Sequence, residues 1–379
     1  MELASPGMGF TILMFLIVLT VIVFVHEMGH YLTARLFKVR VEVFSVGFGR
    51  ELFGWNDSHG TRWRVSALPF GGYVKFFGDQ GVASAPDSAA AQRMSPEDRA
   101  VAFHFKPVWQ RALIVAAGPL INILLAVMIY AGLFATLGQA VTPPRVTAVV
   151  EGSPADRAGF QPGDVITALD GETIDRFEAV ARHISMLPER HVEVTVLRDG
   201  REQFISVVPD RVEIEDRFGN RYEIGRVGIQ GTEQQIVEHN IASAMAAAAH
   251  ETVAVVEMMA TTLWDMVLGK RSIDELGGPV RIAKMSGEQA SLGAIVLISF
   301  IALISVNLGF VNLLPVPMLD GGHLAFYAFE AVRGRPLSLR VQEFATMAGL
   351  MLVFSLFVFL TWNDLANIGV WDRLSKLFS

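Results

Sequence analysis

Long uncharged stretches constrain this chain more than any other feature. Three runs without Asp, Glu, Lys, Arg or His cover residues 112–137, 291–319 and 344–362. A bilayer core of ~30 Å needs about 20 apolar helical residues, so each run can cross it. A fourth run, residues 9–25, is long enough once its helix continues through the polar residues that follow. The sequence predicts four transmembrane helices, at about 9–31, 110–138, 291–319 and 343–362.

The distribution of basic residues predicts the orientation of these helices. Residues 1–30 contain no Lys or Arg, residues 31–111 contain eleven, and the loop at residues 320–343 contains three. Residues 140–290 carry fifteen basic and twenty-four acidic residues. Lys and Arg concentrate in cytoplasmic loops, so we expect the N-terminus and residues 140–290 to be exported. Cleavage of the first run as a signal peptide is disfavoured, because no basic segment precedes it and no small-residue cleavage site follows.

Residues 241–268 form a further helical pattern that is rich in Ala and Met. It contains His250, Glu251, Glu257 and Asp265. A charge near the centre of a membrane helix costs roughly 2.5–3.5 kcal/mol. We therefore expect an amphipathic helix that lies on the outer face or packs on the bundle, with a fifth span as the weaker alternative.

Two segments outside the apolar runs have strand patterns. Residues 39–77 alternate in polarity and are interrupted by glycines, which favours a small sheet that re-enters the membrane under a cover of protein or water. Residues 80–100 are predicted to be a loop. In the exported part, residues 142–210 combine Gly-Ser-Pro-Ala, Ala-Gly-Phe and Pro-Gly-Asp runs with a helix at 177–187 and a hairpin across Asp199-Gly200.

That exported segment resembles a PDZ domain of the bacterial, circularly permuted kind. The resemblance implies peptide binding by addition of a strand to a sheet edge. A spacer or lid without a ligand is the alternative. A short remnant with a hairpin signal at Phe218-Gly219-Asn220 follows near residues 211–232.

The sequence His26-Glu27-Met28-Gly29-His30 lies at the cytoplasmic end of the first predicted span. Residues four apart share a helix face, so both imidazoles can reach one ion, with Glu27 beside it. Two His ligands and a Glu are the components of a hydrolytic zinc site, in which the carboxylate takes a proton from water. Ionisable groups in a membrane helix are costly and usually functional.

A third ligand is expected, and Asp320 is the best candidate. It follows Asn312-Leu313-Leu314-Pro315-Val316-Pro317, where two prolines end a helix. The predicted first and third spans run in the same direction, so His26, His30 and Asp320 reach the same depth. His323 is the competing ligand. Cysteine ligands are excluded because the chain contains no cysteine, and the net charge of −7 gives no indication of a nucleic-acid partner.

These residues together resemble the site-2 proteases, which are intramembrane zinc metalloproteases, and in particular the bacterial regulator-of-sigma-E protease type. The resemblance covers nearly the whole chain. Its further motifs are Gly71-Gly72-Tyr73-Val74-Lys75, Gly118-Pro119-x-x-Asn122, Leu319-Asp320-Gly321 and Gly277-Gly278-Pro279. The best-known members carry two PDZ domains in tandem, whereas this chain has room for one.

The resemblance implies roles for individual residues. His26, His30 and Asp320 would bind Zn²⁺, and Glu27 would activate water. Asn312 would hold the substrate near the metal, and Gly72, Tyr73, Val74 and Lys75 would belong to a strand that pairs with an unwound substrate. For Asn122, a helix-packing contact and a catalytic role are equally open.

The sequence thus predicts a polytopic α-helical membrane protein with a reentrant β-region and an inserted periplasmic PDZ-like α+β domain. Its expected parts are residues 1–140, 141–232, 233–290 and 291–379. It would lie in a bacterial inner membrane, with the active site near the cytoplasmic face. Expected partners are the lipid bilayer, peptide termini and pre-trimmed single-span substrates (an anti-sigma factor and remnant signal peptides). A membrane-anchored PDZ scaffold with an inactive metal site is the alternative, and a metal transporter would require more charged spans.

Overall fold

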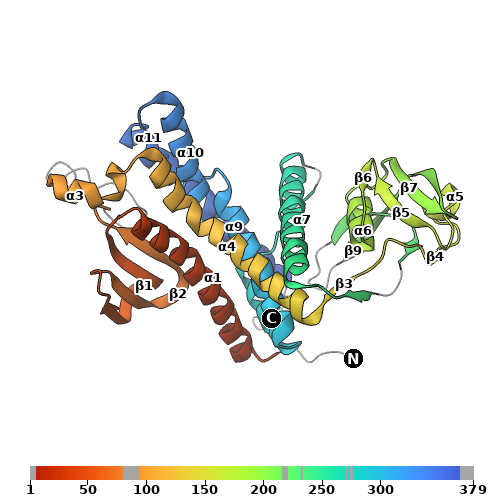
Figure 1. Ribbon diagram of the computed structural model, residues 1–379, viewed down its shortest axis with the longest axis horizontal. Helices are drawn as coiled ribbons and strands as arrows, with labels where there is room; N and C mark the ends of the chain where they lie inside the picture. Colours follow the sequence, from red (N-terminus) through yellow and green to blue (C-terminus); the bar gives the residue numbers. More distant parts are fainter. Residues whose placement is uncertain are drawn as a thin grey trace, which may run out of the picture. The chain divides into compact units, whose positions relative to one another are not determined.

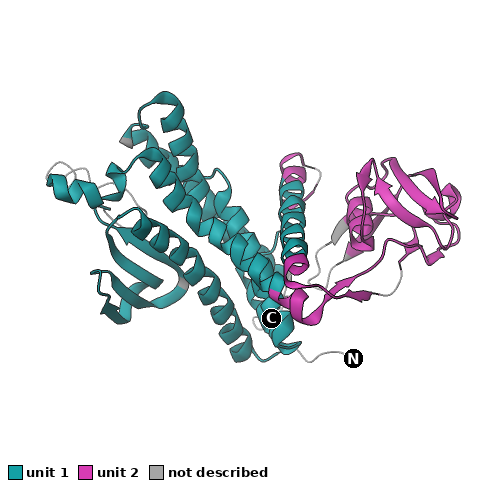
Figure 2. Ribbon diagram, in the orientation of Figure 1, with its two compact units in different colours: residues 1–131, 245–263, 276–366 teal, residues 132–244, 264–275, 367–379 magenta. Residues whose placement is uncertain are grey.

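The structure, a computed structural model, describes residues 6–79, 94–215, 221–231, 234–269, 271–273 and 276–367. The chain forms two compact units (Figures 1 and 2). Unit 1 contains residues 1–131, 245–263 and 276–366, and unit 2 contains residues 132–244, 264–275 and 367–379. The predicted Phe218-Gly219-Asn220 turn and the first part of the predicted 80–100 loop lie outside the described residues.

Five long apolar helices dominate the chain. They are α1 (Met8–Leu36), α4 (Val108–Leu137), α7 (Ile241–Val267), α9 (Ala294–Leu313) and α11 (Leu339–Asn367). Within the described residues, these five helices are long and apolar enough to cross a membrane. The chain is therefore a multi-pass membrane protein. Four of the helices coincide with the predicted spans, and α7 is the helix that was predicted to be amphipathic.

The helix α7 packs against the bundle of unit 1. Its Val255 is buried together with Ala126 of α4 and with Ala302 and Val306 of α9. Small and β-branched side chains at these positions let the three helices approach closely. The structure thus shows contact with the bundle, and both a helix that packs on the bundle without crossing and a fifth span would make this contact.

The chain leaves α9 through a proline-rich turn and enters an unpredicted helix. The helix α9 ends at Leu313, because Pro315 and Pro317 lack the N–H that would continue it. The predicted span to residue 319 is therefore too long. The loop predicted at 320–343 was also wrong, since residues Asp320–Arg333 form α10. This helix has an acid in its first turn, a base in its last turn and a left-handed Gly334 at its end, all of which favour helix formation.

Three shorter helices also lie in unit 1. The predicted 80–100 loop ends instead in α3 (Pro96–Val101), because Ser95 caps the helix by accepting from the Asp98 amide. The one-turn helix η1 (Phe103–Phe105) follows. The helix α8 (Pro279–Ser291) packs on α1, and the Asp364 carboxylate of α11 accepts from the Gly278 and Arg281 amides at its start, at 3.1 and 2.8 Å.

The β-region consists of two long bent strands, β1 (Val41–Asn56) and β2 (Arg62–Phe76), rather than separate short ones. Residues 43–46 lie between the two halves of β2, opposite residues 72–75 on one side and 62–65 on the other. The bends fall at Gly47 and Gly71, whose φ angles of 88° and 94° suit glycine. Asp57, at the turn, accepts hydrogen bonds from Trp63 Nε1 (3.0 Å) and from the Tyr31 hydroxyl of α1 (2.8 Å). These contacts hold the sheet against α1.

Unit 2 contains a four-stranded antiparallel sheet in the order β6-β5-β7-β8. The helix α6 (Phe177–Ser185) packs on this sheet, and Val180 and Ile184 of the helix share its core with Ile166 and Val194. The hairpin of β7 and β8 turns at Asp199-Gly200, both with positive φ, as the sequence predicts. The sheet strands are β5 (Val165–Leu169), β6 (Glu172–Thr173), β7 (Val192–Arg198) and β8 (Arg201–Val207).

Shorter strand pairs surround this sheet in unit 2. They are β3 (Gln139–Val141) with β12 (Gln235–Val237), β4 (Ala148–Val149) with β11 (Ile229–Gln230), and β9 (Asp210–Glu215) with β10 (Arg221–Arg226). The short helix α5 (Pro154–Ala158) is capped by Ser153. The unit is thus an α+β structure inserted between α4 and α7 in sequence.

A buried ion pair fixes the interior of unit 2. Both carboxylate oxygens of Asp164 accept from Arg198, at 2.6 and 2.7 Å, and one also accepts from the Gln161 amide. Burial alone would raise the pKa of Asp164, but these hydrogen bonds outweigh it and lower the pKa. The pair therefore stabilises the unit at neutral pH, and this contribution declines once the pH falls below the ordinary Asp pKa.

Candidate active site

Two histidines present their ring nitrogens to a common point from one face of α1. His26 and His30 are one helical turn apart, and their Nε2 atoms are separated by 3.2 Å. Both residues are buried, at 8% exposure each. Glu27 lies beside them, and the main-chain N–H of Val74 hydrogen-bonds to its carboxylate. The spacing predicted this shared face correctly.

Asp320, the first residue of α10, completes the group. Its Oδ2 atom lies 3.2 Å from His26 Nε2 and 3.5 Å from His30 Nε2. Glycine at 321 makes this approach possible, because a Cβ there would lie 2.2 Å from the Leu314 carbonyl oxygen. A carboxylate oxygen is a usual zinc ligand beside imidazole nitrogens.

The three groups have the geometry of a zinc site. Among the described residues, His26, His30 and Asp320 are the His and acidic side chains whose ligand atoms all lie within 4.8 Å of one another. In a tetrahedral zinc site with bonds of ~2.0–2.1 Å, neighbouring ligand atoms are about 3.3 Å apart. The three distances of 3.2, 3.2 and 3.5 Å match that value. Two imidazoles and one carboxylate also leave a fourth position open, as catalytic zinc sites do.

The helix α4 forms the wall behind the two histidines. His30 Nδ1 donates to the main-chain oxygen of Ile114 at 2.9 Å. One turn further along α4, a Cβ at Gly118 would lie only 2.2 Å from His30 Nε2. The Asn122 side chain, one more turn along, lies 3.3 Å from His26 Nδ1. Gly118 and Asn122 therefore contact the two histidines directly.

A cavity of about 330 Å³ opens beside Glu27 and the three potential ligands. The second half of β2 forms one wall, where Gly72, Tyr73 and Val74 line the cavity. No other described strand pairs with the edge of this segment that faces away from β1. The cavity can therefore receive an extended peptide next to a strand edge. The remaining polar lining comes from Asn312, His323, Tyr327 and Thr346.

The structure brings most of the predicted site residues together, with one exception. Asn312, Gly72, Tyr73 and Val74 line the same cavity as His26 and its neighbours. Lys75 does not line this cavity, and its Nζ pairs with Glu42 at 2.8 Å. His323 lines the cavity but lies outside the three-ligand group, and burial lowers its pKa.

Sequence reasoning missed the contributions of Gly118 and Met318. Gly118 was part of a recognised motif, but its contact with His30 depends on the packing of α4 on α1. Met318 has a φ of 92°, which is unusual for a residue with a side chain, in the turn just before Asp320. Such strain costs about 1–3 kcal/mol and clusters at functional sites. No sequence signal at Met318 indicates it.

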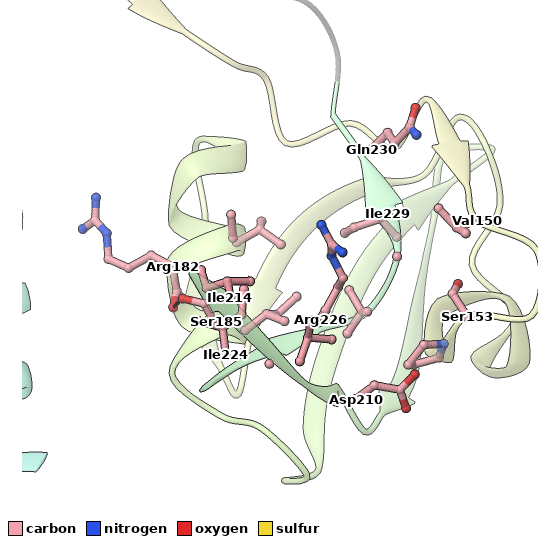
Figure 3. A pocket seen from close by; sticks show the side chains of 18 of the residues that line it. Val150, Ser153, Arg182, Ser185, Asp210, Ile214, Ile224, Arg226, Ile229 and Gln230 are labelled. Carbon is pink, nitrogen blue, oxygen red and sulfur yellow. Dashed lines mark hydrogen bonds between the residues drawn. The ribbon is translucent and has the colours of Figure 1, made fainter. Parts of the chain in front are cut away.

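A second cavity, of about 800 Å³, lies in unit 2 (Figure 3). Its wall includes Val180 and Ile184 of α6, Ile214 and Ile224 of the β9–β10 hairpin, and Ile229 of β11. The lining is thus largely aliphatic. This composition suits apolar side chains of a peptide.

Comparison with known proteins identifies the family. The model of Peptidase family M50 matches residues 14–356. The chain is 46% identical to a protein of Agrobacterium fabrum named a zinc metalloprotease, over 93% of this chain and 95% of that protein. A protein of Rhizobium meliloti with the same description is 45% identical, over 96% and 99%. Metalloprotease MmpA of Caulobacter vibrioides is 38% identical, over 98% and 100%. The chain therefore belongs to peptidase family M50, the site-2 protease family, and is a zinc metalloprotease.

Proposed function

We propose that this zinc metalloprotease cuts peptide bonds inside membrane-spanning segments, with His26, His30 and Asp320 as zinc ligands and Glu27 as general base. One observation carries the proposal. A buried group with tetrahedral zinc spacing adjoins a carboxylate and an open strand edge, and two of its three residues lie on the apolar helix α1. Zinc, when bound, supplies Lewis acidity for the scissile carbonyl and for a water molecule.

Residues of the chain carry out the proton transfer and bind the substrate. Glu27 accepts a proton from the attacking water and delivers it to the leaving amide nitrogen. The main-chain edge of residues 72–76 holds an extended substrate strand beside Glu27, and the Asn312 amide hydrogen-bonds to that strand. Lys75 contributes through its main chain, since its side chain pairs with Glu42. A helical substrate must unwind first, because its amides are otherwise bonded within the helix.

The substrate class follows from the site and from the family resemblance. The substrates are single-span proteins already shortened outside the membrane, such as an anti-sigma factor or remnant signal peptides. Unit 2 acts as a single PDZ-like domain on the periplasmic side. Its aliphatic cavity takes the trimmed peptide end, and the domain excludes substrates whose exported part is still bulky. The enzyme acts in a bacterial inner membrane.

Reconstituted cleavage tests the activity. We expect the purified protein in proteoliposomes to cut a model single-span substrate within its membrane segment and to contain one zinc per chain. A chelator should abolish cleavage and added zinc should restore it. The same substrate with a folded exported domain should be cut at least ten-fold more slowly. Cleavage that persists without zinc refutes the ligand assignment, and equal rates for the two substrates refute the size filter.

In the proposed topology, α1, α4, α9 and α11 cross the membrane, and α7 packs on the bundle without crossing. This arrangement places the C-terminal ends of α1 and α9 on the same side of the membrane. Because the chain has no cysteine, single-cysteine variants report each side without background. In intact spheroplasts, Ser58→Cys and Ser338→Cys should be protected from an impermeant maleimide, whereas Glu202→Cys should react. All three residues are exposed. Reaction of Ser338→Cys but not Ser58→Cys would require a fifth crossing and would contradict the arrangement.

A further inference from the structure

The two histidines differ in what holds their second ring nitrogen. His30 Nδ1 faces the Ile114 carbonyl, which can only accept, so this nitrogen carries the proton. That arrangement leaves the Nε2 lone pair of His30 free for a metal. His26 Nδ1 faces a side chain instead, the Asn122 amide at 3.3 Å.

The Asn122 amide is completely enclosed, at 0% exposure. Its nitrogen is the atom placed near His26, and its oxygen has no hydrogen-bond partner among the described residues. A buried amide oxygen without a partner costs about 1–3 kcal/mol. A half-turn about the last side-chain bond exchanges the two atoms without changing the shape of the side chain.

The position of the proton on the His26 ring determines whether the oxygen or the nitrogen of the Asn122 side chain faces it. A neutral imidazole that gives its Nε2 lone pair to a metal carries its proton on Nδ1. An N–H group needs an acceptor, and of the two amide atoms only the oxygen can accept. We infer that Asn122 presents its oxygen to His26 Nδ1–H and so positions His26 for the metal. This inference rests on the ligand assignment of the proposed function.

The surroundings of Asn122 fix the amide in place. Ser305 of α9 donates from Oγ to the main-chain oxygen of Asn122 at 2.8 Å. One turn from Ser305, a Cβ at Gly309 would lie 2.8 Å from the Pro119 carbonyl oxygen, so α9 and α4 are in close contact. The Asn122 side chain therefore extends from a rigid turn toward His26. This is the usual relation between a metal ligand and the group that orients it.

Zinc affinity of side-chain variants tests this positioning role. Loss of a group that orients a ligand typically weakens metal binding by about 10–100-fold. We expect this loss for Asn122→Leu, which keeps the number and branching of the side-chain heavy atoms but has no acceptor, and near-native affinity for Asn122→Asp, which accepts but cannot donate. Thr136→Ala is the matched control on the same helix, because it removes a side-chain hydrogen bond to the Gly132 carbonyl without touching His26 or Asn122. Competition with a chromophoric chelator measures affinity, and the visible spectrum of the cobalt-loaded protein reports the ligand geometry.

The outcomes separate this inference from the proposed function. If Asn122→Leu binds zinc as tightly as the wild type, Asn122 only packs and the inference is wrong. If Asn122→Leu does not fold, Asn122→Asp decides: weakened binding with an altered cobalt spectrum would mean that the amide nitrogen faces His26. Absence of zinc from the wild-type protein would instead overturn the ligand assignment itself.

Discussion

Replacing Glu27 by glutamine is expected to slow peptide cleavage by about 10²–10⁴-fold while one zinc per chain remains bound. Glutamine has the same shape as glutamate but cannot accept a proton from water. The zinc ligands are unchanged, since Glu27 lies outside the group formed by His26, His30 and Asp320. Single-turnover cleavage of a model single-span substrate gives the rate, and mass spectrometry gives the metal content.

The exposed Glu343 on α11 supplies the control for this substitution. Glu343→Gln removes one negative charge without altering the cavity, so it should leave the cleavage rate within two-fold of the wild type. Two results would contradict the role of Glu27. Cleavage by Glu27→Gln at the native rate would show that another group takes the proton. Loss of zinc from this variant would show that Glu27 is a ligand.

The second large effect is expected from a single methyl group at position 118. Gly118→Ala places a Cβ 2.2 Å from His30 Nε2, well inside van der Waals contact. The imidazole cannot retreat without breaking its hydrogen bond to Ile114 in the same helix. We expect His30 to leave the ligand position, with loss of bound zinc and of cleavage activity.

This loss should occur without unfolding, which makes it diagnostic. Alanine in a helix interior is about 0.5–1 kcal/mol more favourable than glycine, so α4 itself is not weakened. Gly132→Ala is the matched control on the same helix, because its Cβ meets nothing within 4 Å. Zinc content and circular dichroism should show a folded, zinc-loaded control and a folded, zinc-poor Gly118→Ala variant. A full complement of zinc in Gly118→Ala would show that His30 is not a ligand.

Local patterns were sufficient to predict the parts of this site that lie on one helix. The four-residue spacing of His26 and His30 follows from helix geometry alone. The prolines before Asp320 predicted the helix break after α9. The long apolar helices followed from the absence of charge. Each of these inferences depends on the sequence of a single helix or turn.

Features that depend on packing between elements could not be predicted in this way. The contact of Gly118 with His30 exists only because α4 crosses α1 at Gly29, where a Cβ would lie 2.5 Å from the Ala117 carbonyl oxygen. Lys75 was expected at the site because it continues the Gly72–Val74 run, but its side chain pairs with Glu42 instead. The helix α10 was missed because charged residues between two apolar runs are typical of a loop.

The ligands of the proposed zinc site come from residues 26 and 320 of a chain of 379 residues. During translation, the histidines enter the bilayer long before the ribosome has made the aspartate. A nascent chain therefore has an incomplete set of ligands until its last helices emerge. If Asp320 is the third ligand, prematurely terminated products that lack α10 should be inert, even though they carry the histidines and the glutamate.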